Sequence, residues 1–292
     1  MANTETQAAG AAAAEAAEGG LLDQILTQSK IARSDSERTR ARDLIAELVA
    51  QVSDGAMTVS QDAIAALDAR IAEIDRVLSE QLSAVMHAPE FQQLEGSWRG
   101  LKYMVDNSET STSLKIKVFN TSKKELVKDF KNASDFDQST LFKKLYEEEY
   151  GTFGGAPFAT LIGDFEFGRH PEDMYLLEEI SHVCAAAHAP FLSAASPELL
   201  GFDDFTELSG PRDLAKIFDT VEYAKWKSFR ASEDSRYVGL AMPHVLGRLP
   251  YGPDTAPVEA FNFVERTDGS DHNKYLWMNA AYALGTKVTD AF

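Results

Sequence analysis

The chain has 292 residues, enough for one large domain or two smaller ones, and its 44% hydrophobic content can supply a sizeable core. Lysine and arginine total 28 against 46 for aspartate and glutamate, so the formal net charge is -18. This charge argues against nucleic acid and against an anionic membrane surface as partners, because both require basic patches, and it favours a partner with a basic surface.

Cysteine usage and hydropathy indicate the compartment. The single cysteine, Cys184, excludes an intrachain disulfide and a cysteine-based zinc site, and its apolar helical context predicts a buried side chain. The first 20 residues lack the basic and apolar segments of a secretory signal, and no later segment approaches the ~18 apolar residues of a membrane span. We therefore expect a soluble, cytoplasmic protein without direct membrane insertion.

The N-terminal region predicts a tail followed by a helical arm. Residues 1–20 are rich in alanine, glycine, glutamate and threonine, a composition typical of a disordered tail. Residues 21–56 are expected to form an N-terminal helical arm. Its first segment, Leu21–Ile31, is amphipathic, and a capping-box pair, Ser34 and Glu37, begins a second helix. The amphipathic segment suits contact with a partner as well as packing on its own domain.

Residues 57–107 predict a helical hairpin. Pro89 separates two helices, and in each of them apolar residues step by three and four as in a coiled-coil seam. Such narrow stripes usually form a core, but they also suit contact with a neighbouring subunit. The two stripes are Ile64, Leu67, Ile71, Ile74, Leu78, Leu82 and Val85, and Phe91, Leu94, Trp98, Leu101 and Val105.

Residues 108–292 predict an α/β domain. A half-exposed strand is expected where Leu114, Ile116 and Val118 alternate with lysines. A strand, a helix and a strand follow in an order typical of α/β proteins. The fold class is therefore α/β, a mixed sheet covered by helices and preceded by an N-terminal helical arm. Further helices are expected at 122–130, 138–149, 171–188, 210–218, 220–230 and after 273, and further strands at 157–167, 190–196 and 237–243.

Candidate catalytic residues are densest at the turn from the strand at 157–167 into the next helix. Asp164, Glu166 and His170 could bind a divalent metal, since carboxylates and imidazole suit such ions, and would then form a metal-assisted hydrolase. The spacing favours a structural role instead, because Glu172 is an ordinary acidic residue in the first turn of a helix, where it complements the helix dipole. A third alternative is an acidic adaptor module that binds a basic partner without polymerising.

Other catalytic patterns are weak. The glycine-rich stretch at 151–155 precedes a strand, whereas phosphate loops follow one, and the sequence contains no G-x-S-x-G elbow. His244 and His272 stand alone in predicted loops, where histidines usually form hydrogen bonds. The sequence therefore predicts no catalytic residue, no cofactor site and no metal site.

Long stretches of the chain resemble one family. WRGLKYMV at 98–105, EEEYGTFGGAPFATLIGDFEF at 147–167, HPEDMYLLEEISHVCAAAHAPFLSAASP at 170–197 and YAKWKSFRASEDSRYVGLAMPHVLGRLPYGP at 223–253 resemble the large subunit of the type VI secretion contractile sheath, the TssC/VipB family. The resemblance covers nearly all of the chain from about Leu21. It implies a structural subunit without a cofactor, not an enzyme. Family members run longer, so the chain resembles their N-terminal portion.

The resemblance also implies partners. In this family the large subunit pairs with a small sheath subunit, TssB or VipA, and polymerises with other sheath protomers around an inner tube of Hcp, on an envelope-anchored baseplate. Contraction drives the tube and its spike outward. In some members the AAA+ unfoldase ClpV recognises a short helix near the N-terminus, which LLDQILTQSK at 21–30 resembles. The candidate unfoldase contacts are Leu21, Leu22, Ile25, Leu26 and Gln28.

Overall fold

The computed structural model describes residues 39–40, 43–44, 46–47 and 63–292 of the chain. The chain divides into two units, Met1–Asp75 and Arg76–Phe292. In the first unit, the described positions between 39 and 47 are helical, and Ala63 begins α3 (Ala63–Met86), which continues into the second unit. The predicted tail and the amphipathic segment at 21–31 lie outside the described residues. Within the described part, no helix is both long enough and apolar enough to span a bilayer.

The second unit is built around a parallel sheet of three strands in the order β1-β2-β3. Strand β1 (Leu161–Phe167) pairs with β2 (Phe191–Ala195), and β2 pairs with β3 (Val238–Ala241). Helix α7 (Pro171–Ala187) connects β1 to β2. Pro171 suits its first turn because a proline nitrogen needs no hydrogen bond there. The predicted order of strand, helix and strand is therefore confirmed.

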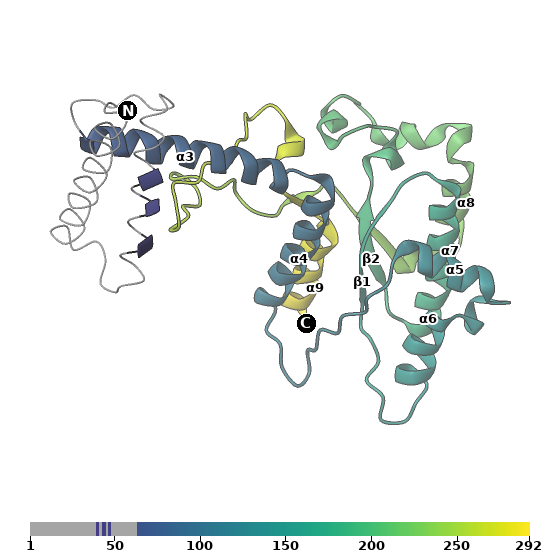
Figure 1. Ribbon diagram of the computed structural model, residues 1–292. Coiled ribbons are helices and arrows are strands. Elements are labelled where there is room, and N and C mark those ends of the chain that lie inside the picture. Colours follow the sequence, from purple (N-terminus) through teal and green to yellow (C-terminus); the bar gives the residue numbers. More distant parts are fainter. Residues whose placement is uncertain (1–38, 41–42, 45, 48–62) are drawn as a thin grey trace, which may run out of the picture. The chain divides into compact units, whose positions relative to one another are not determined.

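Helices cover both faces of this sheet (Figure 1). Helices α7, α5 (Lys123–Asn132) and α8 (Ala224–Ala231) enclose the main core, which includes the fully buried side chains of Phe167, Leu177, Ile180, Val183 and Cys184. Helix α9 (Ala280–Ala291) packs on the sheet and on α4 (Pro89–Asp106). A second, antiparallel pair consists of β4 (Val245–Leu246) and β5 (Trp277–Met278). The predicted α/β class with helical covering is confirmed, and its parallel and antiparallel strands lie in two separate sheets.

Short helical segments complete the domain. The helix expected at 138–149 is present as α6 (Thr140–Phe142), which continues into a π-helix, η2 (Lys143–Tyr150). The other segments are 3₁₀ turns: η1 (Phe136–Gln138), η3 (Pro197–Leu200), η4 (Phe205–Ser209), η5 (Leu214–Asp219), η6 (Val221–Tyr223), η7 (Asp234–Tyr237) and η8 (His272–Lys274).

The strand expected around Leu114–Val118 does not form. The segment has no regular secondary structure and no strand partner among the residues that the structure describes, and Val118 is 71% exposed. It is held by a side chain instead, because Lys117 Nζ lies 2.5 Å from the Glu149 carboxylate and over the Phe158 ring. Alternation predicts an extended, half-exposed backbone, whereas pairing also requires a neighbouring strand.

Two of the three buried residues of helix α4 are glycines. Its buried positions are Gly96, Gly100 and Met104, and a β-carbon at Gly96 would lie 2.6 Å from the carbonyl oxygen of Trp277. A β-carbon at Gly100 would overlap the ring of Tyr282 in α9. The glycines therefore allow an approach that no larger residue would permit.

Candidate functional site

The two carboxylates of β1, those of Glu166 and Asp164, each form a hydrogen bond with another side chain of the protein. Glu166 Oε1 lies 2.7 Å from Nε2 of His244, whose ring packs edge-on against Phe205 with 4.8 Å between the ring centroids. Asp164 is hydrogen-bonded to Tyr282, and burial together with this carboxylate raises the pKa of the tyrosine hydroxyl well above its usual value. The strand directs both carboxylates toward neighbouring side chains of the fold.

His170 is not brought into a metal site with these carboxylates. It caps the N-terminus of α7, where its Nδ1 accepts a hydrogen bond of 3.3 Å from the backbone N–H of Glu172. Among the described residues there is no group of three or more histidine, cysteine, aspartate or glutamate side chains that could hold a metal ion. The structure gives each of the three proposed metal ligands a separate structural contact.

The acidic residues at the start of α7 are paired with lysines of α5. Lys123 Nζ lies 2.6 Å from Asp173 Oδ1, donates to the carbonyl oxygen of Glu166 at 2.7 Å and lies over the ring of Phe167. Lys131 Nζ donates to Glu172 at 2.8 Å, and this hydrogen bond lowers the pKa of the Glu172 carboxyl. These contacts fasten α5 to the turn between β1 and α7. They support a structural role for the acidic residues between Asp164 and Asp173.

A groove of about 670 Å³ runs beside β1. Its walls are mostly amide, hydroxyl and aromatic side chains from α4, β1 and the segment before α9. Two backbone carbonyls of β1 are already occupied there, since Asn279 donates to Phe165 O at 2.8 Å and Lys123 to Glu166 O. The lining residues are Gln92, Gln93, Gly96, Ser97, Ser122, Lys123, Asp164, Phe165, Glu166, His244, Asn273, Tyr275, Trp277, Met278 and Asn279.

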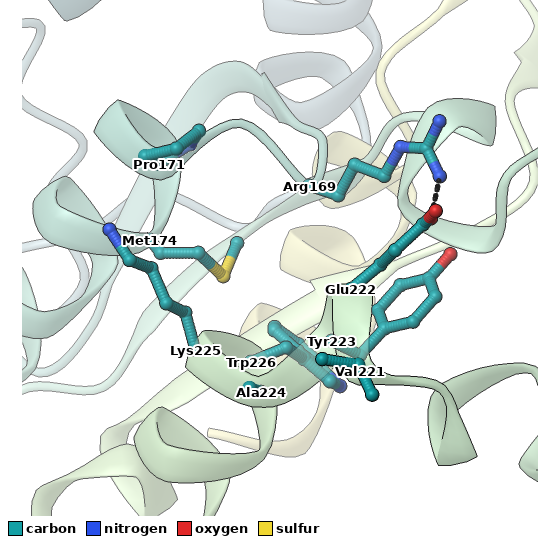
Figure 2. A pocket seen from close by; sticks show the side chains of 9 residues that line it. All are labelled: Arg169, Pro171, Met174, Val221, Glu222, Tyr223, Ala224, Lys225 and Trp226. Atoms are coloured by element: carbon teal, nitrogen blue, oxygen red, sulfur yellow. Dashed lines mark hydrogen bonds and ion pairs between the residues drawn. The ribbon is translucent and has the colours of Figure 1, made fainter.

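A smaller pocket of about 290 Å³ lies at the N-terminal end of α7 (Figure 2). Pro171 and Met174 of α7 face Trp226 across it, and Arg169 forms an ion pair of 2.8 Å with Glu222 at its rim. This pair is well exposed and therefore contributes little stability. The pocket holds no arrangement of nucleophile, base and oxyanion donors.

Sequence reasoning missed a buried ionic cluster. Arg248 forms a forked pair with Glu265, with distances of 2.5 and 3.1 Å, and its Nε lies 2.9 Å from Glu95 of α4. His87 Nε2 lies 3.1 Å from Glu265, and Arg99 Nε 2.6 Å from Glu95. The members are up to 178 residues apart, so no local spacing could have revealed the cluster.

The environment of Glu265 keeps it charged. Its side chain is 1% exposed. Burial alone would raise the pKa of Glu265, but hydrogen bonds from Arg248 and from the backbone N–H of Tyr251 outweigh burial and hold the pKa below its usual value. The cluster thus ties His87, directly after α3, and the middle of α4 to the loop at 248–265 by charge-assisted hydrogen bonds.

The lone cysteine lies in the core. Cys184 is fully buried in α7, and burial raises the pKa of its thiol to about 12. A thiol with so high a pKa is not ionised at neutral pH and does not act as a nucleophile. The prediction of a buried, structural cysteine is confirmed.

Comparison with known proteins assigns the chain to a family. Residues 68–292 match the profile of VipB, described as EvpB/VC_A0108, tail sheath N-terminal domain. The chain belongs to the TssC/VipB family of sheath proteins. It is also similar to a type VI secretion system sheath protein, TssC1 of Pseudomonas aeruginosa, with 49% identity over 259 residues.

The match covers most of this chain but only about half of the relative. It covers 87% of this chain and 52% of the relative, so the chain spans about half the length of the relative. The family predicted from the sequence strings is confirmed, and it is a family of structural sheath subunits. The predicted unfoldase contacts, from Leu21 to Gln28, lie outside the described residues.

Proposed function

We propose that this chain acts as a structural subunit of the type VI secretion contractile sheath. It pairs with the small sheath subunit, TssB or VipA, and polymerises with other protomers around the Hcp inner tube in the cytoplasm, on the envelope-anchored baseplate. Contraction of the lattice propels the tube and its spike. The observation that carries the proposal is the family match over residues 68–292, which includes the whole parallel sheet and its helices.

The chemistry of the described residues supports a role based on interfaces. The carboxylates that resembled an active site are engaged by His244, Tyr282, Lys123 and Lys131. In such a subunit, work comes from repacking between two lattice states and not from a reaction inside the chain.

Coexpression of the full chain with the small sheath subunit tests the proposal. We expect the two proteins to copurify and to form tubules or oligomers visible by negative-stain microscopy. The P. aeruginosa relative, coexpressed with its own small subunit, serves as the positive control. A chain that stays monomeric and ignores the small subunit, while the control assembles, contradicts the proposal.

The same experiment separates the alternatives. An acidic adaptor module would give a saturable, salt-sensitive one-to-one complex without oligomers. A metal-assisted hydrolase would contain a stoichiometric metal ion that Glu166→Ala removes. The hydrogen bond between Glu166 and His244 gives the carboxylate a structural partner, which favours the sheath subunit over the hydrolase.

We also propose that ClpV recognises the segment around Leu21–Gln28. This proposal rests on the resemblance of LLDQILTQSK to the unfoldase-binding helix of some family members and on its amphipathic pattern. A helix of this kind offers one apolar face to a groove on the unfoldase, so the apolar positions should carry the binding.

A further inference from the structure

The loop that joins η2 to β1 holds a phenylalanine away from the domain. Phe153 is fully exposed. The loop is fixed at both ends, because the backbone N–H of Gly151 donates to the carbonyl oxygen of Tyr146 at 2.6 Å, and that of Ala156 donates to the Glu149 carboxylate at 2.9 Å. The ring is therefore presented to solvent on a loop of defined shape.

Two glycines make this shape possible. Gly154 has a φ of 84°, in the left-handed region that favours glycine. A β-carbon at Gly155 would lie 2.2 Å from the carbonyl oxygen of Glu149, so only glycine fits there as well. The glycine-rich stretch thus has a structural reason that involves no phosphate, since it allows the turn that carries Phe153 outward.

The pocket at the N-terminal end of α7, here called the α7 pocket, has room for such a ring (Figure 2). Its apolar walls are formed by Pro171, Met174, Val221 and Trp226, and its volume is about 290 Å³. An apolar cavity of about 150 Å³ already accommodates benzene. The pocket opens to solvent, since Val221 is 91% exposed. A phenyl side chain of another molecule can therefore enter it.

The exposed ring and the α7 pocket lie at opposite ends of the same helix. Tyr150, just before the loop, lies against His188 at the C-terminal end of α7, with 6.0 Å between the ring centroids. The pocket lies at the N-terminal end. Helix α7 has 17 residues and is therefore roughly 25 Å long. Because the loop is also fixed at its base, Phe153 cannot enter the pocket of its own copy.

Unpaired charges beside the two features are complementary. Glu147 and Glu148 precede the loop, are exposed, and form no ion pair with any residue that the structure describes. They end a helix whose lysines, Lys143–Lys144, lie a turn earlier, and negative charge at a helix C-terminus is unfavourable unless a cation lies near.

The side of the α7 pocket formed by α8 supplies such cations. Lys225 lines the pocket, and Arg230 lies over the ring of Trp226 at 5.9 Å. Both side chains are exposed, and within the described part of the chain neither has a carboxylate partner. Helix α8 contains no acidic residue, in a chain of net charge -18. The acidic loop and the basic wall therefore attract each other when two copies meet.

We propose that Phe153 of one copy inserts into the α7 pocket of a second copy, with Glu147 and Glu148 near Lys225 and Arg230. Two different surfaces meet in this contact, so it repeats from copy to copy without closing, as in a helical assembly. The inference deepens the proposed function and rests on it, since it names one contact between neighbouring copies of the chain in the lattice.

A photo-crosslinker tests the contact. The amino acid p-benzoylphenylalanine in place of Phe153 keeps an aromatic side chain and, under ultraviolet light, bonds to C–H groups that touch it. The full chain is irradiated alone and after coexpression with the small sheath subunit, and mass spectrometry locates the adducts. Lys225→Glu reverses a charge at the pocket, and Lys124→Glu, at an exposed lysine of α5, is the matched control. Circular dichroism checks that the variants are folded.

We expect cross-linked multimers of the chain, with adducts within residues 171–174 or 221–226. Lys225→Glu should lower their yield about 3-fold, the loss typical of an exposed ion pair, and Lys124→Glu should leave it unchanged. Adducts elsewhere on the chain, adducts on the small subunit, or equal losses in the two variants overturn the proposal.

Electron microscopy of the same samples separates this inference from the proposed function. Tubules without adducts between copies overturn the contact and leave the sheath function standing. Adducts at the α7 pocket in the chain alone, without any complex with the small subunit, contradict the sheath function and leave the contact between copies standing. Absence of both tubules and adducts overturns both.

Discussion

The ring of Tyr282 occupies the space into which any side chain at position 100 would project. Helix α4 therefore meets α9 at a point where only glycine fits, and this contact sets the rotation of α4 about its own axis. Where a sequence pattern would place the apolar stripe inward, the pair of Gly100 and Tyr282 turns it outward.

Substitution of Gly100 tests this contact. Gly100→Ala should lower the free energy of unfolding by about 1–2 kcal/mol, because overpacking against Tyr282 outweighs the gain in helix propensity. Thermal unfolding followed by circular dichroism measures the effect. Gly252→Ala is the matched control, since the nearest atom to its new β-carbon lies at an ordinary 3.5 Å. Equal stability of the two variants contradicts the prediction.

The pKa of Glu265 predicts acid sensitivity. A carboxyl whose pKa is lower in the folded than in the unfolded protein stabilises the fold above its unfolded value, and this contribution is lost as the pH falls through the folded value. Urea unfolding of the wild type should therefore show a free energy that drops on acidification below about pH 4.5.

The Glu265→Gln variant isolates this contribution. It leaves the Arg248 guanidinium buried without its forked partner, so it should cost about 3–5 kcal/mol at pH 7. The loss relative to wild type should shrink at acid pH, where the native carboxyl is itself protonated. A difference between the two proteins that stays the same at pH 7 and at pH 3.5 contradicts this role.

The contribution of Glu179 to stability should depend on pH in the opposite direction to that of Glu265. Burial raises the pKa of its carboxyl, so the charged form is penalised in the folded protein and stability is lost as the pH rises through the folded value. We expect Glu179→Gln to unfold at a higher temperature than the wild type at pH 7, with the gap closing near pH 4. Differential scanning calorimetry at the two pH values measures it, and a variant less stable at pH 7 than the wild type refutes the prediction.

The hydroxyl of Ser193 supplies hydrogen bonds at the point where the register between β1 and β2 is irregular. The register of β1 against β2 shifts between Ile162 and Glu166, and the buried Ser193 hydroxyl lies 2.9 Å from the carbonyl oxygen of Gly163 and 2.8 Å from that of Phe165. Ser193→Ala should cost about 1–3 kcal/mol in urea unfolding, since it removes the donor that these carbonyls share.

Ser181 is the matched control for that change. It is equally buried, but its hydroxyl bonds Glu178 O within α7, where the helix already provides a backbone donor. Ser181→Ala should therefore cost less. Equal losses would show that burial of the serine, and not the bulge in β1, determines the effect.

The proposed unfoldase segment makes a separate prediction. Leu22→Asp combined with Ile25→Asp should abolish the pull-down of the chain by ClpV, because two charges would interrupt its apolar face. Assembly with the small sheath subunit should persist. A control with the same added charge, Ala8→Asp with Ala11→Asp, should bind ClpV normally. Unchanged binding of the Leu22 and Ile25 variant rejects the assignment.

The sequence predicted the central layers of the fold well. The apolar residues of β1 and β2, and the long apolar helix between them, are signals that a local sequence pattern carries. The alternating segment around Ile116 misled because alternation describes one strand, whereas a sheet requires a second, which the described residues do not supply. The expected place of Glu172 in the first turn of a helix agrees with the structure, since its position directly after Pro171 is a local signal of a helix start.

Two features were beyond the reach of sequence patterns. The orientation of α4 depends on whether its apolar stripe or its glycines face the domain, and only the shape of Tyr282 and Trp277 decides between them. The cluster of Arg248, Glu265 and Glu95 joins charges that periodicity treats as surface residues. Both depend on contacts between residues far apart in the chain, which no window of neighbouring residues contains.

The buried thiol has a practical consequence for following this molecule in an assembly. Cys184 is the only cysteine of the sequence, and it is buried and un-ionised at neutral pH. The folded chain should therefore not react with maleimide dyes or thiol-specific spin labels. A substitution such as Leu94→Cys would therefore introduce the single reactive handle. A probe attached to that thiol would report, by its mobility or its quenching, whether the exposed side of α4 becomes covered when the chain assembles.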